Sequence, residues 1–432
     1  MESEKPAAGW STRGRLSPGL RARCESPTPP PIGCGVRDDE QVSFDSFAQT
    51  AQASEPGANG HTDARSSMLV VELAAIPDAA DGFETWRIGL RRAVLTNVAE
   101  FVAAQCAAEL AAAGVDVAAD ILMDFVIGGK CLRSTFMCLG WLCGAAPTDA
   151  ALRAAASFEL LHVFALLQDD VMDASASRRG RPAAHIQFAR WHRERKLSGS
   201  ARRFGESAAT LLADLCLIWS EQMLRESGVE HPRLQQAWPR YDAMRTELAV
   251  GQFADIATDV RDLPSMGAVL EVARRKSGNY TVRRPLEIGA AMAGCGDHTV
   301  SRLGRYGAAV GEAFQLRDDL LGVFGSPAVT GKPSGGDLIE RKATSVVVAA
   351  HQMADAPTRR QLTELMNSEH LDDSALDRWR MLIIATGAAQ LVEDMITDRA
   401  KSARNELGEI RIDESVRAAL ANMAAVCTKR AA

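Results

Sequence analysis

Apolar residues recur at helical spacing through most of this 432-residue chain, from about Phe83 onward. Leu90, Val94, Val98 and Phe101 illustrate a spacing that places such side chains along one face of an amphipathic helix. No credible series of short segments with the strict alternation of β-strands accompanies it. The sequence therefore predicts an all-α fold, with roughly ten helical stretches in one large domain.

Turn-forming residues divide these helical stretches from one another. The predicted breaks lie at residues 128–129, 146–147, 175–182, 227–232, 263–264 and 325–337. Residues 1–66 have a different composition, with seven of the seventeen prolines mixed with Ser, Gly and charged residues. Such a segment buries too little to offset the entropy of ordering, so we expect a disordered extension before a domain over residues 67–432. Met68 is a candidate start of the ordered chain.

Charge and cysteine usage exclude several classes of protein. The 49 Lys and Arg residues are outnumbered by 55 Asp and Glu, which gives no basic field for nucleic acid. The nine cysteines include no CxxC pair, so free thiols in a reducing cytoplasm are the expected state. The N-terminal part has no apolar run of the 7 to 15 residues typical of a secretory leader, so we expect none. No charge-free stretch of 18 or more apolar residues occurs, so we also expect no membrane span.

Three aspartates end the apolar helix predicted before residue 174. Asp169 and Asp173 lie one turn apart with Asp170 between them, so the three carboxylates share one end of the helix. Two such charges about 5 Å apart repel by about 3 kcal/mol at an effective dielectric near 20. A hard cation with oxygen ligands, such as Mg²⁺, relieves that cost. Arg178 and Arg179 follow after four intervening residues and could bind a diphosphate held by the metal.

A second acidic cluster and several basic residues extend this pattern. Asp318 and Asp319 lie on another predicted helix, with Gln315 one turn before Asp319. Glycine-opened or helical segments carry the remaining cations, namely Lys130, Arg133, Lys276, Lys332 and Lys342. Any one of these cations alone is more simply explained as a solvent-exposed surface residue. Together they indicate a cavity in which metal ions bridge two diphosphates.

The motifs and their order resemble those of the trans-isoprenyl diphosphate synthase (polyprenyl synthetase) family over about residues 85–430, especially the bacterial geranylgeranyl and farnesyl diphosphate synthases. Gly128 to Arg133 reads GGKCLR, and His162 lies seven residues before Asp169. The resemblance implies the isoprenoid synthase fold around a central cavity, a homodimer, and about three Mg²⁺ ions per active site. It also implies isopentenyl diphosphate and an allylic diphosphate (dimethylallyl, geranyl or farnesyl) as substrates.

The resemblance assigns roles to the matching residues. Metal binding falls to Asp169, Asp170, Asp173, Asp318 and Asp319, and catalysis to Asp169, Asp170, Lys276 and Asp318. Substrate binding falls to Lys130, Arg133, His162, Arg178, Arg179, Lys276, Gln315, Lys332 and Lys342. Phe164 and Ala165, five and four residues before Asp169, match the positions that limit chain length. Only the first is aromatic here, which favours geranylgeranyl diphosphate as product, with farnesyl diphosphate as the alternative.

Three residues depart from the family pattern. Cys131 replaces a common Arg, Gln168 replaces a common His, and Gly322 replaces the last Asp of the second motif. We expect the first two replacements mainly to tune the affinity for substrate. We expect the protein to remain active despite the third. A class I terpene cyclase is the nearest alternative function, but Leu320 to Gly325 offers none of the Ser, Thr or Glu ligands of its second metal motif. A non-catalytic partner subunit is the other alternative, against which the complete first motif argues.

Overall fold

The computed structural model describes residues 76, 80–257, 263–325, 335–368 and 370–429. Contacts divide the chain into Met1–Ser46 and Phe47–Ala432, and all described residues belong to the second unit. The described part is helical apart from one two-stranded hairpin, which confirms the all-α prediction. The predicted extension over residues 1–66 and its boundary lie outside the described residues and stay predictions.

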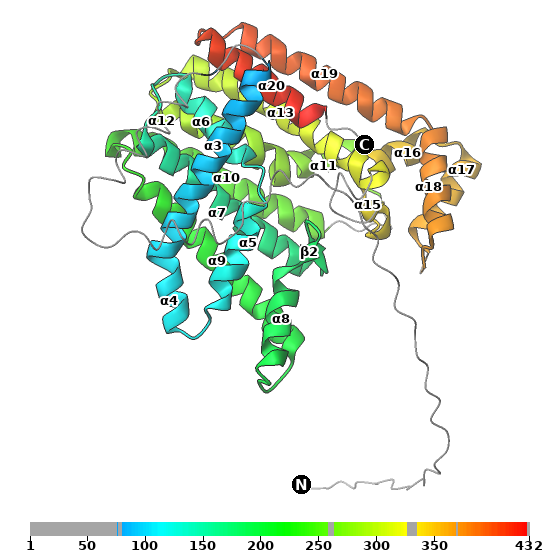
Figure 1. Ribbon diagram of the computed structural model, residues 1–432. Coiled ribbons are helices and arrows are strands. Elements are labelled where there is room, and N and C mark those ends of the chain that lie inside the picture. Colours follow the sequence, from blue (N-terminus) through cyan, green and yellow to red (C-terminus); the bar gives the residue numbers. More distant parts are fainter. Residues whose placement is uncertain (1–75, 77–79, 258–262, 326–334, 369, 430–432) are drawn as a thin grey trace, which may run out of the picture. The chain divides into compact units, whose positions relative to one another are not determined.

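The first half of the domain supplies most of the larger of two apolar cores. Figure 1 shows how its helices are arranged. Its elements are α3 (Ala80–Phe101), the π-helix η1 (Val102–Cys106), α4 (Ala107–Ala112), α5 (Val117–Ile127), α6 (Leu132–Leu142), α7 (Asp149–Met172), the hairpin β1 (Ser177–Arg178) and β2 (Arg181–Pro182), α8 (Ala184–Glu194), α9 (Ala201–Arg225) and α10 (His231–Ile256). Because helices α4 and α5, and α8 and α9, are separated by short turns, the structure contains more helices than the roughly ten stretches predicted.

The second half contributes to both cores. Its elements are α11 (Met266–Ala273), the π-helix η2 (Arg274–Arg283), α12 (Arg284–Met292), α13 (Asp297–Phe324), α15 (Gly336–Ile339), α16 (Ser345–Met353), α17 (Ala356–Met366), α18 (Asp373–Ala385), α19 (Ala388–Gly408) and α20 (Glu414–Thr428). Helix α20 returns to contact α3 at the other end of the described chain (Figure 1).

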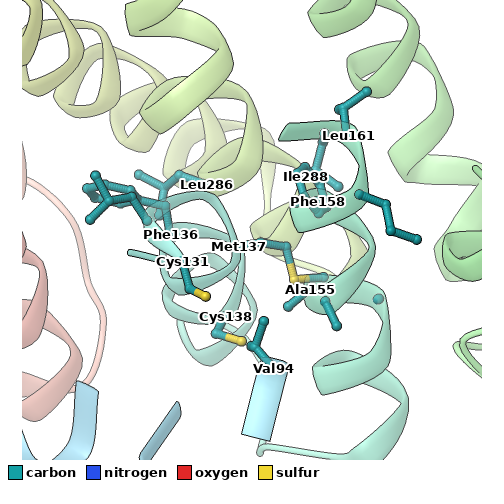
Figure 2. Close-up of a cluster of buried hydrophobic side chains, with 14 of the residues drawn as sticks. Val94, Cys131, Phe136, Met137, Cys138, Ala155, Phe158, Leu161, Leu286 and Ile288 are labelled. Atoms are coloured by element: carbon teal, nitrogen blue, oxygen red, sulfur yellow. The ribbon is translucent and has the colours of Figure 1, made fainter. Parts of the chain in front are cut away.

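The centre of the larger core lies between α6, α7 and α12. Figure 2 shows Phe136 and Met137 of α6 beside Phe158 of α7 and Leu286 of α12. These four side chains are fully buried, and each such burial stabilises the fold by about 1.5–3 kcal/mol. Helix α7 also packs along α9, so the helix that ends in the three aspartates is held on several sides.

Helix α13 connects the two cores. Its first half packs in the larger core through side chains such as Tyr306 and Val310. Its second half packs through Leu316 and Leu320 against the smaller core formed with α15 to α19. Asp318 and Asp319 lie in this second half, so both cores fix their position.

Two helical stretches, Gly82–Ala112 and Asp149–Met172, have the length and composition of a membrane span. In the second, 67% of the most apolar window is buried by the rest of the described protein. A core helix of a globular protein satisfies the same test. The expectation of no membrane span therefore stays a prediction.

Candidate active site

A cavity of about 1170 Å³ opens among α6, α7, η2, α13 and the segment that begins with α15. Its volume exceeds the range of about 300–1,000 Å³ that is usual for a single small ligand. Predicted site residues that line it are Lys130, Arg133, His162, Asp169, Asp173, Arg178, Arg179, Lys276, Gln315, Asp318, Asp319 and Lys342. The fold thus brings together residues that are more than 200 positions apart.

Four predicted site residues lie elsewhere. Asp170 is fully buried and is absent from the cavity lining. Phe164 and Ala165 are partly buried on α7 against the larger core and are absent from the described cavity lining, so their role in chain length stays a prediction. Lys332 lies outside the described residues.

The first acidic cluster lies at the carboxyl end of α7, where the helix dipole disfavours negative charge. Side-chain cations offset that cost. Oδ2 of Asp169 lies 2.9 Å from Nη2 of Arg178, and Oδ1 lies 3.1 Å from Nζ of Lys276. Burial alone would raise the pKa of Asp169, but Lys276 and Arg178 outweigh it and lower the pKa to about 2. Asp169 is therefore ionised at neutral pH.

Asp170 has a different environment although it is the next residue. Its Oδ1 accepts a hydrogen bond of 2.8 Å from Nε of Arg178, whereas Oδ2 is buried and has no hydrogen-bond partner. Burial raises the pKa of Asp170 despite the opposing charge of Arg178. Asp170 thus fixes the Arg178 side chain, and its second oxygen still has a lone pair to offer a cation.

Arg178 and Arg179 reach the cavity from a tight hairpin between β1 and β2. Arg179 and Gly180 both have positive φ, 53° and 74°, as the two central residues of a type I′ turn require. The turn directs the two guanidinium groups apart. Arg178 binds the aspartates of α7, and Nη1 of Arg179 donates to the carbonyl of Phe125 at 2.9 Å.

A basic cluster, formed by Lys130, Arg133, His162 and Arg179, lines another part of the cavity. Arg133 donates to Oγ1 of Thr281 at 3.0 Å, and its guanidinium carbon lies 4.0 Å from the centre of the Tyr280 ring. Burial, with the charges of Arg133 and Arg179, holds the pKa of His162 well below its usual value, so the imidazole is neutral. This part of the cavity suits an anion that arrives without a metal ion.

Cys131 shapes the start of α6 from within this cluster. It adopts a left-handed conformation with φ 50°, which is unusual for a residue other than glycine. Its side chain is buried, and burial raises the pKa of the thiol far above the usual value. Cys131 is therefore an unreactive, buried residue that packs between the positions of Lys130 and Arg133.

The two aspartates of the second acidic cluster have different surroundings. Asp318 lines the cavity from α13. Asp319 accepts hydrogen bonds from Nε2 of Gln315 at 2.8 Å and from the hydroxyl and backbone N–H of Ser345 at 2.6 and 3.0 Å. Its Oδ2 therefore ties α13 to the first turn of α16, whereas its Oδ1 bonds within α13. Direct metal binding by Asp319 stays a prediction.

Lys342 connects acidic residues of different elements. Nζ of Lys342 lies 3.1 Å from Asp173 and 2.7 Å from Glu340. Burial opposes its charge, but Asp173 and Glu340 raise the pKa of Lys342 above the usual value.

The sequence predicted a loop from residue 325 to 337, whereas Gly336–Ile339 forms the single turn α15.

Asp255 is a site residue that the sequence analysis missed. It lines the cavity from the end of α10, and its Oδ2 lies 2.7 Å from Nζ of Lys276. The available signal was Gly251, because a glycine inside a helix is unfavourable by about 1 kcal/mol relative to alanine and often marks close packing. A Cβ on Gly251 would lie 2.5 Å from the backbone nitrogen of Lys276, so only glycine lets η2 approach α10.

The described residues contain no group of three Asp, Glu, His or Cys side chains that could hold a metal ion by themselves. Lysine and arginine side chains lie between the carboxylates instead. The donor set still fits Mg²⁺, because Asp169, Asp173 and Asp318 supply carboxylate oxygens to a cavity open to further oxygen ligands. The adjacent Asp170 adds a buried Oδ2 that has no hydrogen-bond partner. Phosphate oxygens would complete such a site.

The charges on the described lining are balanced. Seven basic side chains, Lys130, Arg133, Arg178, Arg179, Lys276, Arg341 and Lys342, face seven acidic ones, Asp169, Asp173, Asp255, Asp318, Asp319, Asp337 and Glu340. A polyanion that displaces these cations from the carboxylates must bring other cations with it. The arrangement therefore suits one anion accompanied by divalent metal and a second anion in the basic cluster.

Comparison with known proteins supports this interpretation. The family model described as polyprenyl synthetase matches residues 115–381. A geranylfarnesyl diphosphate synthase from Aeropyrum pernix is 30% identical over 288 residues, 66% of this chain and 84% of that protein. A geranylgeranyl diphosphate synthase from Mycobacterium tuberculosis is 32% identical over 263 residues, 60% of this chain and 69% of that protein.

A solved structure of similar architecture is the geranylgeranyl pyrophosphate synthase from Corynebacterium glutamicum, complexed with isoprenyl diphosphate and magnesium. It has a TM-score of 0.75 and 34% sequence identity, and the match covers 79% of this chain and 99% of that one.

Proposed function

Because the chain belongs to the polyprenyl synthetase family, we propose that it makes geranylgeranyl diphosphate from isopentenyl diphosphate and shorter allylic diphosphates. The family establishes prenyl transfer between such diphosphates as the reaction class. The length of the product is the finer part of the proposal, since the two similar synthases described above are named for different products. Phe164 without an aromatic neighbour at Ala165 favours the geranylgeranyl product over farnesyl diphosphate.

The structural observation that carries the proposal is the separation of a basic cluster from an acid-rich remainder within one cavity. In the basic cluster, Lys130, Arg133 and Arg179 would hold the diphosphate of the isopentenyl substrate. Neutral His162 adds a hydrogen-bonding group without competing charge. In the acid-rich part, carboxylates and cations alternate, which suits a diphosphate bound with metal.

Asp169, Asp170, Asp173 and Asp318 are the residues that would hold Mg²⁺, with about three ions per site. When bound, magnesium neutralises the charge that develops on the departing diphosphate. The chain's own cations share that work: Arg178, Lys276 and Lys342 lie beside the same carboxylates and can turn to phosphate oxygens. Preorganised cations of this kind stabilise charge as it forms in the transition state.

The remaining steps require no nucleophilic side chain. Departure of the diphosphate leaves an allylic cation, and the double bond of isopentenyl diphosphate attacks it to form the new carbon–carbon bond. The carbon next to the resulting cation then loses a proton to the released diphosphate, which restores a double bond. The protein contributes position, because Arg133 and Arg179 hold the second substrate while Arg178 and Lys276 hold the first.

Product analysis tests the proposal. The full chain is incubated with labelled isopentenyl diphosphate and dimethylallyl, geranyl or farnesyl diphosphate, and the dephosphorylated products are separated by length. The proposal expects geranylgeraniol as the main product from each primer. Products of another length would refute the product assignment, and unaltered substrates would refute the activity.

We also propose that the chain acts as a homodimer in the cytoplasm. Leu211 and Ile218, two turns apart on α9, are 64% and 60% exposed, which is unusual for large apolar side chains on one helix face. A second copy of this chain would cover them.

The proposed cytoplasmic location is supported by the cysteines of the described residues, which are all free thiols. They are Cys106, Cys131, Cys138, Cys143, Cys216, Cys295 and Cys427.

A further inference from the structure

Gly322 lies on α13 one helical turn after Asp318, where the resemblance predicts a third aspartate. A Cβ atom built on Gly322 would lie 1.8 Å from Oδ2, 2.4 Å from Cγ and 3.0 Å from Oδ1 of Asp337. These three nearest atoms all belong to one carboxyl group. The Asp337 carboxylate thus fills the space that a side chain at position 322 would occupy.

This carboxylate reaches the same face of α13 as Asp318. Positions 318 and 322 are neighbours on a helix surface because they are four residues apart. Asp318, Gly322 and Asp337 all line the cavity. The fold therefore places an acidic group one turn beyond Asp318, although the sequence of α13 does not encode one there.

The position of Asp337 is fixed by its own short element. Leu338, the next residue, is fully buried in the smaller core and anchors α15. The backbone carbonyl of Asp337 accepts a hydrogen bond of 2.9 Å from the N–H of Lys342. The side chain is thereby held against α13 by the same segment that delivers Lys342 to the cavity.

We propose that Asp337 replaces the carboxylate missing at Gly322 and completes the second acidic cluster for magnesium bound with a diphosphate. The glycine and the aspartate then form a matched pair, in which the absence of a side chain on α13 makes room for an acid from α15. The inference rests on the magnesium-dependent function proposed above. It predicts that moving the carboxylate back to α13 is tolerated only when Asp337 is shortened.

The test is a titration of Mg²⁺ into the full chain in the presence of inorganic pyrophosphate, followed by calorimetry. Asp337→Ala should weaken the apparent Mg²⁺ affinity at least tenfold. Gly322→Asp alone should lower the melting temperature, because the new side chain collides with Asp337. The double variant Gly322→Asp with Asp337→Ala should regain most of the Mg²⁺ affinity, since the alanine leaves room for the aspartate.

Two further variants make the outcome decisive. Asp394→Ala, at an exposed aspartate on α19, is the control and should leave Mg²⁺ affinity unchanged. Asp337→Asn keeps the shape of the side chain and replaces Asp337→Ala if that variant does not fold. Unchanged affinity in Asp337→Asn, or a folded double variant that binds no better than Asp337→Ala, overturns the inference alone. Failure of the unaltered chain to bind Mg²⁺ with pyrophosphate overturns the proposed function as well.

Discussion

Nζ of Lys276 lies 3.1 Å from Oδ1 of Asp169, so a cation from η2 occupies the side of α7 where the acidic residues converge. The same ammonium group lies 2.7 Å from Asp255 of α10. Three elements therefore meet at one positive charge. This arrangement makes the acidic cluster stable in the absence of a ligand and keeps a cation ready for a diphosphate.

The first prediction concerns stability at acid pH without metal. The pKa of Asp169 is lowered from 3.8 to about 2, so its ionised form stabilises the fold above pH 3.8 by about 2 kcal/mol. That contribution is lost as pH falls from about 4 to about 2. Asp169→Asn should therefore reduce the free energy of unfolding at pH 7 and flatten its decline below pH 4, as measured by urea denaturation at several pH values.

Asp170→Asn is the matched comparison and should act in the opposite direction. The pKa of Asp170 is raised by burial, so its ionised form destabilises the fold once pH exceeds the usual pKa of an aspartate. At pH 7 the asparagine should therefore stabilise the metal-free protein. Equal loss of stability in both variants would contradict the assignment of different environments to the two carboxyl groups.

The second prediction concerns His162. Because its pKa is held well below the usual 6.5, its imidazole should stay neutral from pH 8 down to pH 6.5 in the folded protein. Carbon-13 chemical shifts of labelled histidine, assigned with His162→Gln, should show no titration of this ring in that range. The unfolded chain gains this proton below pH 6.5, so the contribution of His162 to stability is full above pH 6.5 and declines below it.

The third prediction concerns product length. Replacing Phe164 by Ala should lengthen the products by at least one isoprene unit, because it removes bulk beneath the aspartates of α7. Phe101→Ala is the control, since Phe101 is also partly buried against the larger core but lies on α3. Chromatography of dephosphorylated products gives the measurement. An unchanged distribution from a well-folded Phe164→Ala protein would remove the basis of the product assignment.

The fourth prediction concerns assembly. Leu211→Glu combined with Ile218→Glu should convert a dimer into a monomer, because each charge would be desolvated in an interface between two copies of α9. Light scattering coupled to size-exclusion chromatography measures the mass directly. Glu206→Gln, at a partly exposed position near the start of the same helix, should leave the dimer intact. A monomeric unaltered chain would contradict the proposal.

The sequence predicted the helical class and the segments that carry the acidic and basic residues, because apolar spacing and charged motifs are local properties. It could not show that Asp319 binds Ser345 or that Asp255 binds Lys276, since these contacts depend on how distant helices pack. The π-helical form of η2 was equally hidden. Gly322 looked like a lost carboxylate in the sequence, whereas the fold places Asp337 there.

The measurement that tests the central claim most directly is release of inorganic pyrophosphate from an allylic diphosphate. Release should require both Mg²⁺ and isopentenyl diphosphate, stop in excess chelator, and fall at least a hundredfold in Asp169→Ala, a loss of about 2.7 kcal/mol in transition-state stabilisation. Release that continues without isopentenyl diphosphate would indicate a cyclase or a phosphatase. Release that continues undiminished in excess chelator would contradict a magnesium-dependent prenyl transfer at the aspartates of α7.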